Sequence, residues 1–148
     1  MPPTADSPVL RLAYIELAAL LSAPYWARCH TRTVLGAWQI QPETAGTAEL
    51  LVSELITNAA KFSTGAFPLP YPDPEKAECI SLALRLQRDR LVIEITDSDM
   101  NPPVLAEAGL DAESGRGLML VQALSKEWGS FYPLSGRKTV YCVLGTGS

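Results

Sequence analysis

Cysteine and histidine are scarce in this sequence, and their scarcity limits the chemistry that the chain can support. Its 148 residues include one histidine and three cysteines, Cys29, Cys79 and Cys142. The cysteines are odd in number, stand far apart and form no C-x-x-C pair. Their spacing gives no basis for a disulfide framework or a zinc site. We expect buried thiols in a reducing compartment.

An excess of basic residues is also missing, as is any long apolar run. The net charge is −4, so the chain has no general basic surface for nucleic acid or an anionic membrane. No stretch approaches the ~20 apolar residues of a membrane span. Residues 10–23 resemble the core of a signal peptide, but Glu16 interrupts them and nothing basic precedes Arg11. We expect a cytoplasmic protein without nucleic-acid or membrane partners.

What the chain does have is enough apolar sequence for one core. Hydrophobic residues make up 47% of it and charged residues 19%, a balance typical of a globular domain. The sequence shows no internal repeats. We expect a flexible tail over residues 1–8 and a single domain over residues 9–148.

Hydrophobic periodicity predicts helices and strands in mixed order. Residues 9–19 fit a strand or a helix, and the strand is favoured because Ser22 and Pro24 favour a helix start just beyond them. Helices are expected over residues 23–38, from near Pro42 to about Phe62, and from the Gly115-x-Gly117 motif to about Lys126. Two hairpins are expected, from strands 79–86 with 90–96 and 127–132 with 138–144.

A proline-rich segment, Gly65–Lys76, separates the second helix from the first hairpin. It carries four prolines between Pro68 and Pro74, which exclude a helix or a central strand. A surface excursion and a partner-docking polyproline II segment both fit this composition.

The stretch from Glu49 to Ser63, ELLVSELITNAAKFS, combines a broad apolar helical face with two polar residues. Glu54 and Asn58 stand one helical turn apart and therefore project from the same side. An Asn side-chain oxygen is a hard ligand that Mg²⁺ accepts alongside phosphate oxygens. A Glu one turn earlier is placed to take a proton from an attacking hydroxyl.

Two other features complement this helix. Asp97 follows a buried strand, and a carboxylate there can accept a hydrogen bond from an exocyclic amine such as that of adenine. Gly115-x-Gly117 opens a helix, where exposed backbone N–H groups and glycines suit polyphosphate. Alone, each feature is common: a solvated charge, a turn residue and a weak phosphate motif. Together they predict a nucleotide site.

These stretches resemble three motifs of the GHKL (Bergerat-fold) ATPase superfamily. SELITNAAKFS is similar to the N box, TDSDMNPP to a degenerate first glycine box and ESGRGLMLVQALSKEWG to the second. The closest similarity is to anti-sigma-factor serine/threonine kinases and their single-domain relatives. The resemblance implies an α+β fold, a two-layer α/β sandwich whose mixed, mainly antiparallel sheet has helices packed on one face.

The resemblance also implies roles for individual residues, with ATP and Mg²⁺ as cofactors. Asn58 would coordinate Mg²⁺ and Glu54 would be the general base. Asp97 would read the adenine amino group. The remaining candidates for the nucleotide site are Lys61, Gly115, Arg116, Gly117 and Thr139. The Thr139 hydroxyl would assist in the adenine pocket, although an ordinary strand threonine explains this residue equally well.

Two departures from the family's pattern keep a second hypothesis open. The first glycine box is usually D-x-G-x-G, whereas Ser98, Asp99 and Met100 follow Asp97, and the span to Gly115 is short for an ATP lid. The leading hypothesis is an ATP-binding regulator that phosphorylates a protein partner such as a sigma or anti-anti-sigma factor, with a homodimer allowed. The alternative is a non-catalytic interaction module of the same fold.

The end of the N-box-like stretch, Lys61-Phe62-Ser63, is also similar to the N box of sensor histidine kinases. Those kinases, however, need a separate pair of helices that carries the phosphoacceptor. The one histidine, His30, lies in ARCHTRT without an acidic neighbour or a preceding dimerisation helix. We expect His30 to be a surface or partly buried helix residue.

Overall fold

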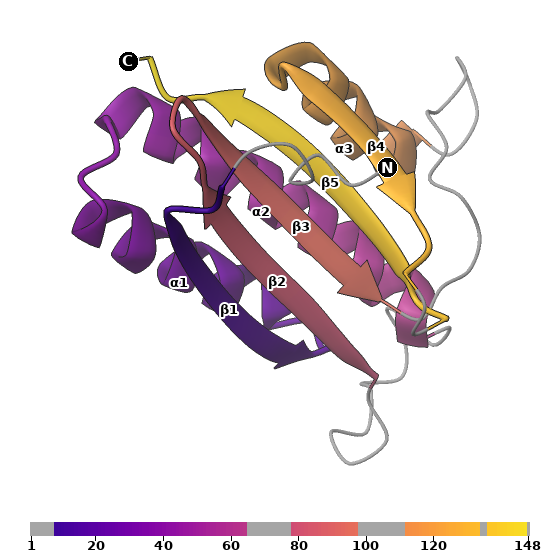
Figure 1. The fold of residues 1–148 in the computed structure, drawn as a ribbon. Coiled ribbons are helices and arrows are strands. Elements are labelled where there is room, and N and C mark those ends of the chain that lie inside the picture. Colours follow the sequence, from indigo (N-terminus) through magenta and orange to yellow (C-terminus); the bar gives the residue numbers. More distant parts are fainter. Residues whose placement is uncertain (1–7, 65–77, 98–111, 134–135, 148) are drawn as a thin grey trace.

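The computed structural model describes residues 8–64, 78–97, 112–133 and 136–147 (Figure 1). These residues form eight elements: β1 (Arg11–Ala18), α1 (Ala23–Ala37), α2 (Pro42–Thr64), β2 (Cys79–Leu86), β3 (Arg90–Asp97), α3 (Ala112–Leu124), β4 (Glu127–Phe131) and β5 (Lys138–Gly145). The expected N-terminal tail (apart from Pro8), the proline-rich segment and the short lid after Asp97 lie outside the described residues.

The five strands form one sheet in the order β1-β2-β3-β5-β4. Each pairing of neighbouring strands in it is antiparallel. Figure 1 shows α1, α2 and α3 together on one face of this sheet. The expected α+β two-layer sandwich is therefore confirmed, as are the strand at residues 9–19 and both hairpins.

The alternation of side chains along each strand decides which residues meet the helices. On β3, Leu91, Ile93 and Ile95 are buried in the core, as are their register partners on β5, Leu144, Cys142 and Val140. The α2 residues Leu51, Val52, Leu55, Ile56, Ala59 and Ala60 belong to the same core. The intervening strand residues face the other side of the sheet.

Helix α1 is held against α2 by polar contacts as well as by the core. The Arg28 guanidinium donates to Ser53 Oγ at 2.8 Å, and Arg32 forms an ion pair with Glu49 at 2.9 Å. The Arg32–Glu49 pair contributes little stability because Arg32 is exposed. None of the helices that the structure describes is both long and apolar enough to cross a membrane.

The expectation of buried thiols is correct for one cysteine of the three. Cys142 is buried and burial raises the pKa of its thiol to about 12. Cys29 is half-buried in α1, whereas Cys79 is exposed at the start of β2. Cys79 is exposed because it is the first residue of β2, at one end of the sheet. The sequence pattern does not show that this position is exposed.

Candidate functional site

Helix α2 presents Glu54 and Asn58 on the side that faces α3. Both residues are half-buried, while Leu55, Ile56 and Ala59 between and beside them are buried in the core. A spacing of four residues brings their side chains one above the other on the helix. The same helix therefore anchors the core and holds a carboxylate and an amide at its margin.

Gly117 of α3 lies directly against these two side chains. A Cβ added at Gly117 would stand 3.0 Å from Glu54 Oε2 and 3.3 Å from Asn58 Nδ2. Such distances are shorter than ordinary van der Waals contact, so a larger residue would displace the Glu54 carboxylate. The structure thus brings together two motifs that lie far apart in the sequence.

The position of Gly117 within its helix differs from the sequence-based expectation. Helix α3 begins at Ala112, three residues before Gly115, so neither glycine opens the helix. The two glycines predict a helix start at this point because glycine has low helix propensity. Gly117 instead permits the close approach of α3 to α2.

Asp97 is the last residue of β3 and is 2% exposed. It follows Leu91, Ile93 and Ile95 in the alternation and therefore lies on the helix-covered face. Its register partner on β5 is Lys138, which is 5% exposed. Side chains of directly paired residues share one face of the sheet, so an acidic and a basic side chain are buried opposite each other here.

Sequence reasoning missed Lys138, although a signal was present. Val140, Cys142 and Leu144 follow it at every second position and are apolar, which places Lys138 on the core face of its strand. Pairing it with Asp97 requires the register of β3 with β5, which the sequence alone does not specify.

Thr139 lies on the opposite face of the sheet from Asp97. Its hydroxyl is hydrogen-bonded to the Thr96 hydroxyl at 2.7 Å, and the two residues are register partners. This placement favours the interpretation of Thr139 as an ordinary strand threonine. Beside it, Arg137 donates to the carbonyl oxygens of Cys79 and Thr96 and so ties the start of β5 to β2 and β3.

The other candidates are placed only by their backbones. Lys61 is in the last two turns of α2, and Gly115 and Arg116 are in the first half of α3. Within the described parts of the chain, no three His, Cys, Asp or Glu side chains gather into a metal-binding group. A site with Asn58 as its protein ligand does fit Mg²⁺, because this ion commonly takes one or two protein ligands and completes its shell with phosphate and water. The amide nitrogen of Asn58 is the atom that faces Gly117, so the ligand would be the oxygen of the same amide.

His30 is half-buried in α1, as expected. Among the described residues, no hydrogen bond or ion pair joins it to Glu54 or Asp97. Its Nε2 atom is buried and has no hydrogen-bond partner among the described residues, and burial lowers the pKa of the ring. We assign it no role in the nucleotide site.

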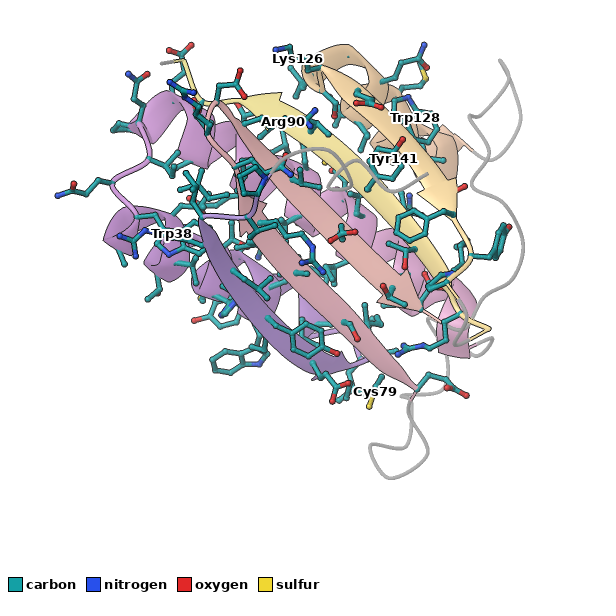
Figure 2. The ribbon with its side chains drawn as sticks, in the orientation of Figure 1. Trp38, Cys79, Arg90, Lys126, Trp128 and Tyr141 are labelled. Atoms are coloured by element: carbon teal, nitrogen blue, oxygen red, sulfur yellow. The ribbon has the colours of Figure 1, made fainter. Side chains whose placement is uncertain are left out.

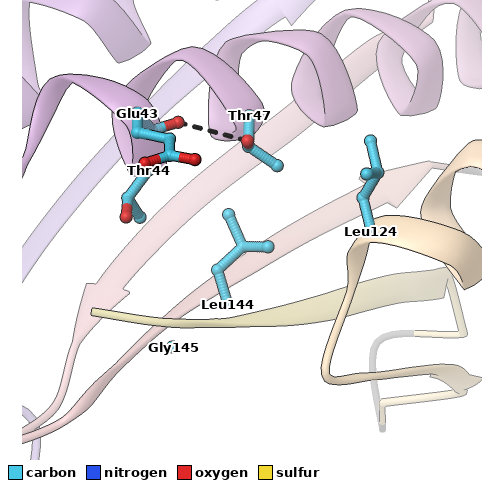
Figure 3. A pocket seen from close by; sticks show the side chains of 6 residues that line it. All are labelled: Glu43, Thr44, Thr47, Leu124, Leu144 and Gly145. Carbon is cyan, nitrogen blue, oxygen red and sulfur yellow. Dashed lines mark hydrogen bonds between the residues drawn. The ribbon is translucent and has the colours of Figure 1, made fainter. Parts of the chain in front are cut away.

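A separate hollow lies where the first turns of α2 meet the end of β5 (Figure 3). Its volume is about 220 Å³, and it is lined by Glu43, Thr44, Thr47, Leu124, Leu144 and Gly145. Lys138 and Gly145 are the two ends of the eight-residue strand β5, roughly 20 Å apart at the usual rise per residue. The hollow is therefore distinct from the site at Asp97.

The fold defines a class, an α+β domain in which three helices cover one face of an antiparallel sheet. The chain belongs to the histidine kinase-like ATPase domain family, whose family model matches residues 18–140. This match confirms the superfamily that the three sequence motifs indicate. No curated protein matches the chain.

Solved structures share the fold at low sequence identity. One is the structure of the RsbU and RsbW domains of Rv1364c from Mycobacterium tuberculosis, with a TM-score of 0.59 and 17% identity over 90% of this chain. The match spans only 32% of that longer chain. Another is the SiaB–SiaC complex from Pseudomonas aeruginosa, with a TM-score of 0.57 and 16% identity over 96% of this chain and 93% of the other.

Proposed function

We propose that this protein is a regulator that binds Mg-ATP beside Glu54 and Asn58 of α2, where α3 packs on this helix, and transfers the γ-phosphoryl group to a serine or threonine of a protein partner. The observation that carries the proposal is the approach of Gly117 to Glu54 and Asn58. It joins the N box and the second glycine box in one place, with the carboxylate of Glu54 and the amide of Asn58 side by side.

Each residue has a distinct part in the proposed reaction. The Asn58 side-chain oxygen would hold Mg²⁺, which supplies charge neutralisation on the phosphate oxygens. Glu54 would accept the proton of the acceptor hydroxyl, while the hydroxyl oxygen bonds to the γ-phosphorus and ADP departs. Asp97 would accept a hydrogen bond from the adenine amino group. Positioning of the reacting groups by α2 and α3 would supply much of the rate enhancement.

A sigma factor or an anti-anti-sigma factor is the proposed partner. The fold is shared with part of the chain that holds the RsbU and RsbW domains of Rv1364c and with a chain of the SiaB–SiaC complex. Complex formation with another protein is thus known for a structural relative whose match covers 96% of this chain. Regulation of transcription in the cytoplasm would follow from such a partner.

The second candidate, a binding module without catalysis, is favoured by one observation. Lys138 is buried directly opposite Asp97, so the carboxylate proposed to read adenine already faces a positive charge. If the two groups only neutralise each other, the fold persists as a partner-binding surface with weak or no nucleotide affinity.

Calorimetric titration with ATP, with and without Mg²⁺, separates these candidates. We expect Mg-dependent binding to the wild type, loss of that binding in Asn58→Ala, and wild-type binding by Glu54→Ala. Glu49→Gln, on the same helix, is the matched control because its partner is the exposed Arg32. Absence of heat and of a thermal shift at millimolar ATP would leave only the binding module.

Transfer is tested on a partner captured from the native host and incubated with labelled ATP. We expect label on a serine or threonine of the partner with the wild type and with Glu49→Gln. Glu54→Ala should lower the transfer rate by about 10²- to 10⁴-fold. Phosphorylation by Glu54→Ala at the wild-type rate would remove Glu54 as the base.

A further inference from the structure

Lys138 occupies a place in the fold where a lysine needs an explanation. Its side chain is 5% exposed, and lysine is almost never fully buried unless it is paired. It is the first helix-facing residue of β5, ahead of the buried Val140, Cys142 and Leu144. Its strand register sets it opposite Asp97.

The Asp97–Lys138 pair lies at the boundary between the hydrophobic core and the candidate site. In Figure 1, β3 ends and β5 begins at the same end of the molecule as the last turns of α2. The next helix-facing residues inward, Ile95 and Val140, belong to one core cluster with Ala59 and Ala60 of α2. Asp97 and Lys138 therefore lie just beyond the core, next to the helix that carries Asn58.

An adenine ring presents a donor and an acceptor side by side along one edge. The amino group N6 donates, and the adjacent ring nitrogen N1 accepts. A carboxylate only accepts, while a lysine ammonium has three donors and no acceptor role. One ammonium donor can serve Asp97 and another can serve N1, so the two side chains together match both atoms.

Thr139 cannot supply the donor that N1 requires. Its hydroxyl lies on the sheet face away from the helices, where it is bonded to Thr96. Lys138 is the register partner of Asp97 on β5, and it lies on the same face of the sheet as Asp97.

We propose that Lys138 is a second base-reading residue, which donates a hydrogen bond to adenine N1 while Asp97 accepts one from N6. The inference rests on the proposed ATP binding and specifies how the base is recognised. A contact with the base would also explain why Lys138 is buried, in addition to its pairing with the charge of Asp97.

The test compares ATP with 1-deaza-ATP, in which a C–H group replaces N1, by calorimetric titration of the full chain. We expect the wild type to bind 1-deaza-ATP about 10- to 100-fold more weakly, the range for losing a hydrogen bond to a charged group. In Lys138→Met, this ratio should fall to about one. Lys126→Met is the matched control, because Lys126 is exposed at the opposite end of the sheet from Cys79 (Figure 2) and should keep the wild-type ratio.

Equal binding of the two nucleotides by the wild type would overturn the role of Lys138 and leave ATP binding intact. Persistence of the wild-type ratio in Lys138→Met would overturn it as well. Absence of any ATP binding by the wild type would refute the proposed function, and this inference with it. Since the wild-type comparison needs no variant, it can overturn the proposal even if Lys138→Met fails to fold.

Discussion

The two ends of α2 meet β5 in opposite ways. Toward its C-terminal end, α2 carries Glu54 and Asn58 against Gly117 of α3, and β5 contributes the buried Lys138 opposite Asp97. At its N-terminal end, α2 borders an open hollow of about 220 Å³, where β5 contributes Leu144 and Gly145 (Figure 3). One end is closely packed and holds buried charges, and the other is open and combines polar side chains of α2 with two leucines, Leu124 and Leu144.

The difference shows that open space is a poor guide to the site in this fold. Burying charged side chains is costly unless they are compensated, so a chain that keeps Asp97 and Lys138 buried bears a cost that the hollow does not impose. Polar residues such as Glu43 at the hollow are solvent-exposed and carry no such cost. This contrast supports our proposal that the function lies at the polar end.

The largest expected effect on stability concerns the buried charges at the polar end. Lys138→Met leaves the Asp97 carboxylate buried without the opposite charge, and such changes cost about 3–5 kcal/mol in unfolding free energy. The double variant Asp97→Leu/Lys138→Met should recover most of this loss. Urea unfolding measures both. If the single variant were as stable as the wild type, the two charges would not be coupled.

A smaller effect is expected at the hollow. Leu144→Ala removes a side chain that is buried on one side and borders the hollow on the other, so we expect a loss of about 2–3 kcal/mol, near the low end for buried leucine. ATP affinity should stay unchanged because the hollow is far from Asp97. A large loss of ATP affinity in a folded Leu144→Ala protein would show that the two ends are coupled.

The smallest effect is a pH dependence from His30, outside both ends. Burial lowers the pKa of His30 below its usual 6.5, so the unfolded chain binds a proton at a higher pH than the folded one. This contribution to stability is present above pH 6.5 and is lost as the pH falls toward the folded pKa. Urea unfolding between about pH 7.5 and pH 5 should therefore give a steeper decline for the wild type than for His30→Gln. Parallel curves would remove His30 as the cause.

Much of the fold follows from the sequence because its periodicity is clear. The alternation in residues 79–86 and 90–96 predicts β2 and β3 within one residue of their ends, and the strand favoured for residues 9–19 is β1. The start of α3 was harder to predict, since glycine propensity favours a start at Gly115 and not at Ala112. Tertiary packing against Glu54 and Asn58 outweighs that local preference.

The candidate site is less predictable, because side-chain partners depend on register and on helix packing. The spacing of Glu54 and Asn58 is local, and a helical turn suffices to predict their common side. The opposition of Asp97 and Lys138 depends on how β3 pairs with β5, which are separated by more than forty residues. The close approach of Gly117 depends on how α3 packs on α2, which no local pattern specifies.

The most direct test of the central claim, that α2 and α3 together form the nucleotide site, is calorimetric titration of Mg-ATP into Gly117→Ala and Gly46→Ala. A Cβ at Gly46, in the first half of α2, meets no atom of the described residues within 4 Å, whereas one at Gly117 stands 3.3 Å from the side-chain amide of Asn58, the proposed Mg²⁺ ligand. Each change should favour its helix by about 0.5–1 kcal/mol. We predict unchanged ATP affinity in Gly46→Ala and clearly weakened affinity in Gly117→Ala without loss of stability. Equal affinity in the two variants would contradict the account.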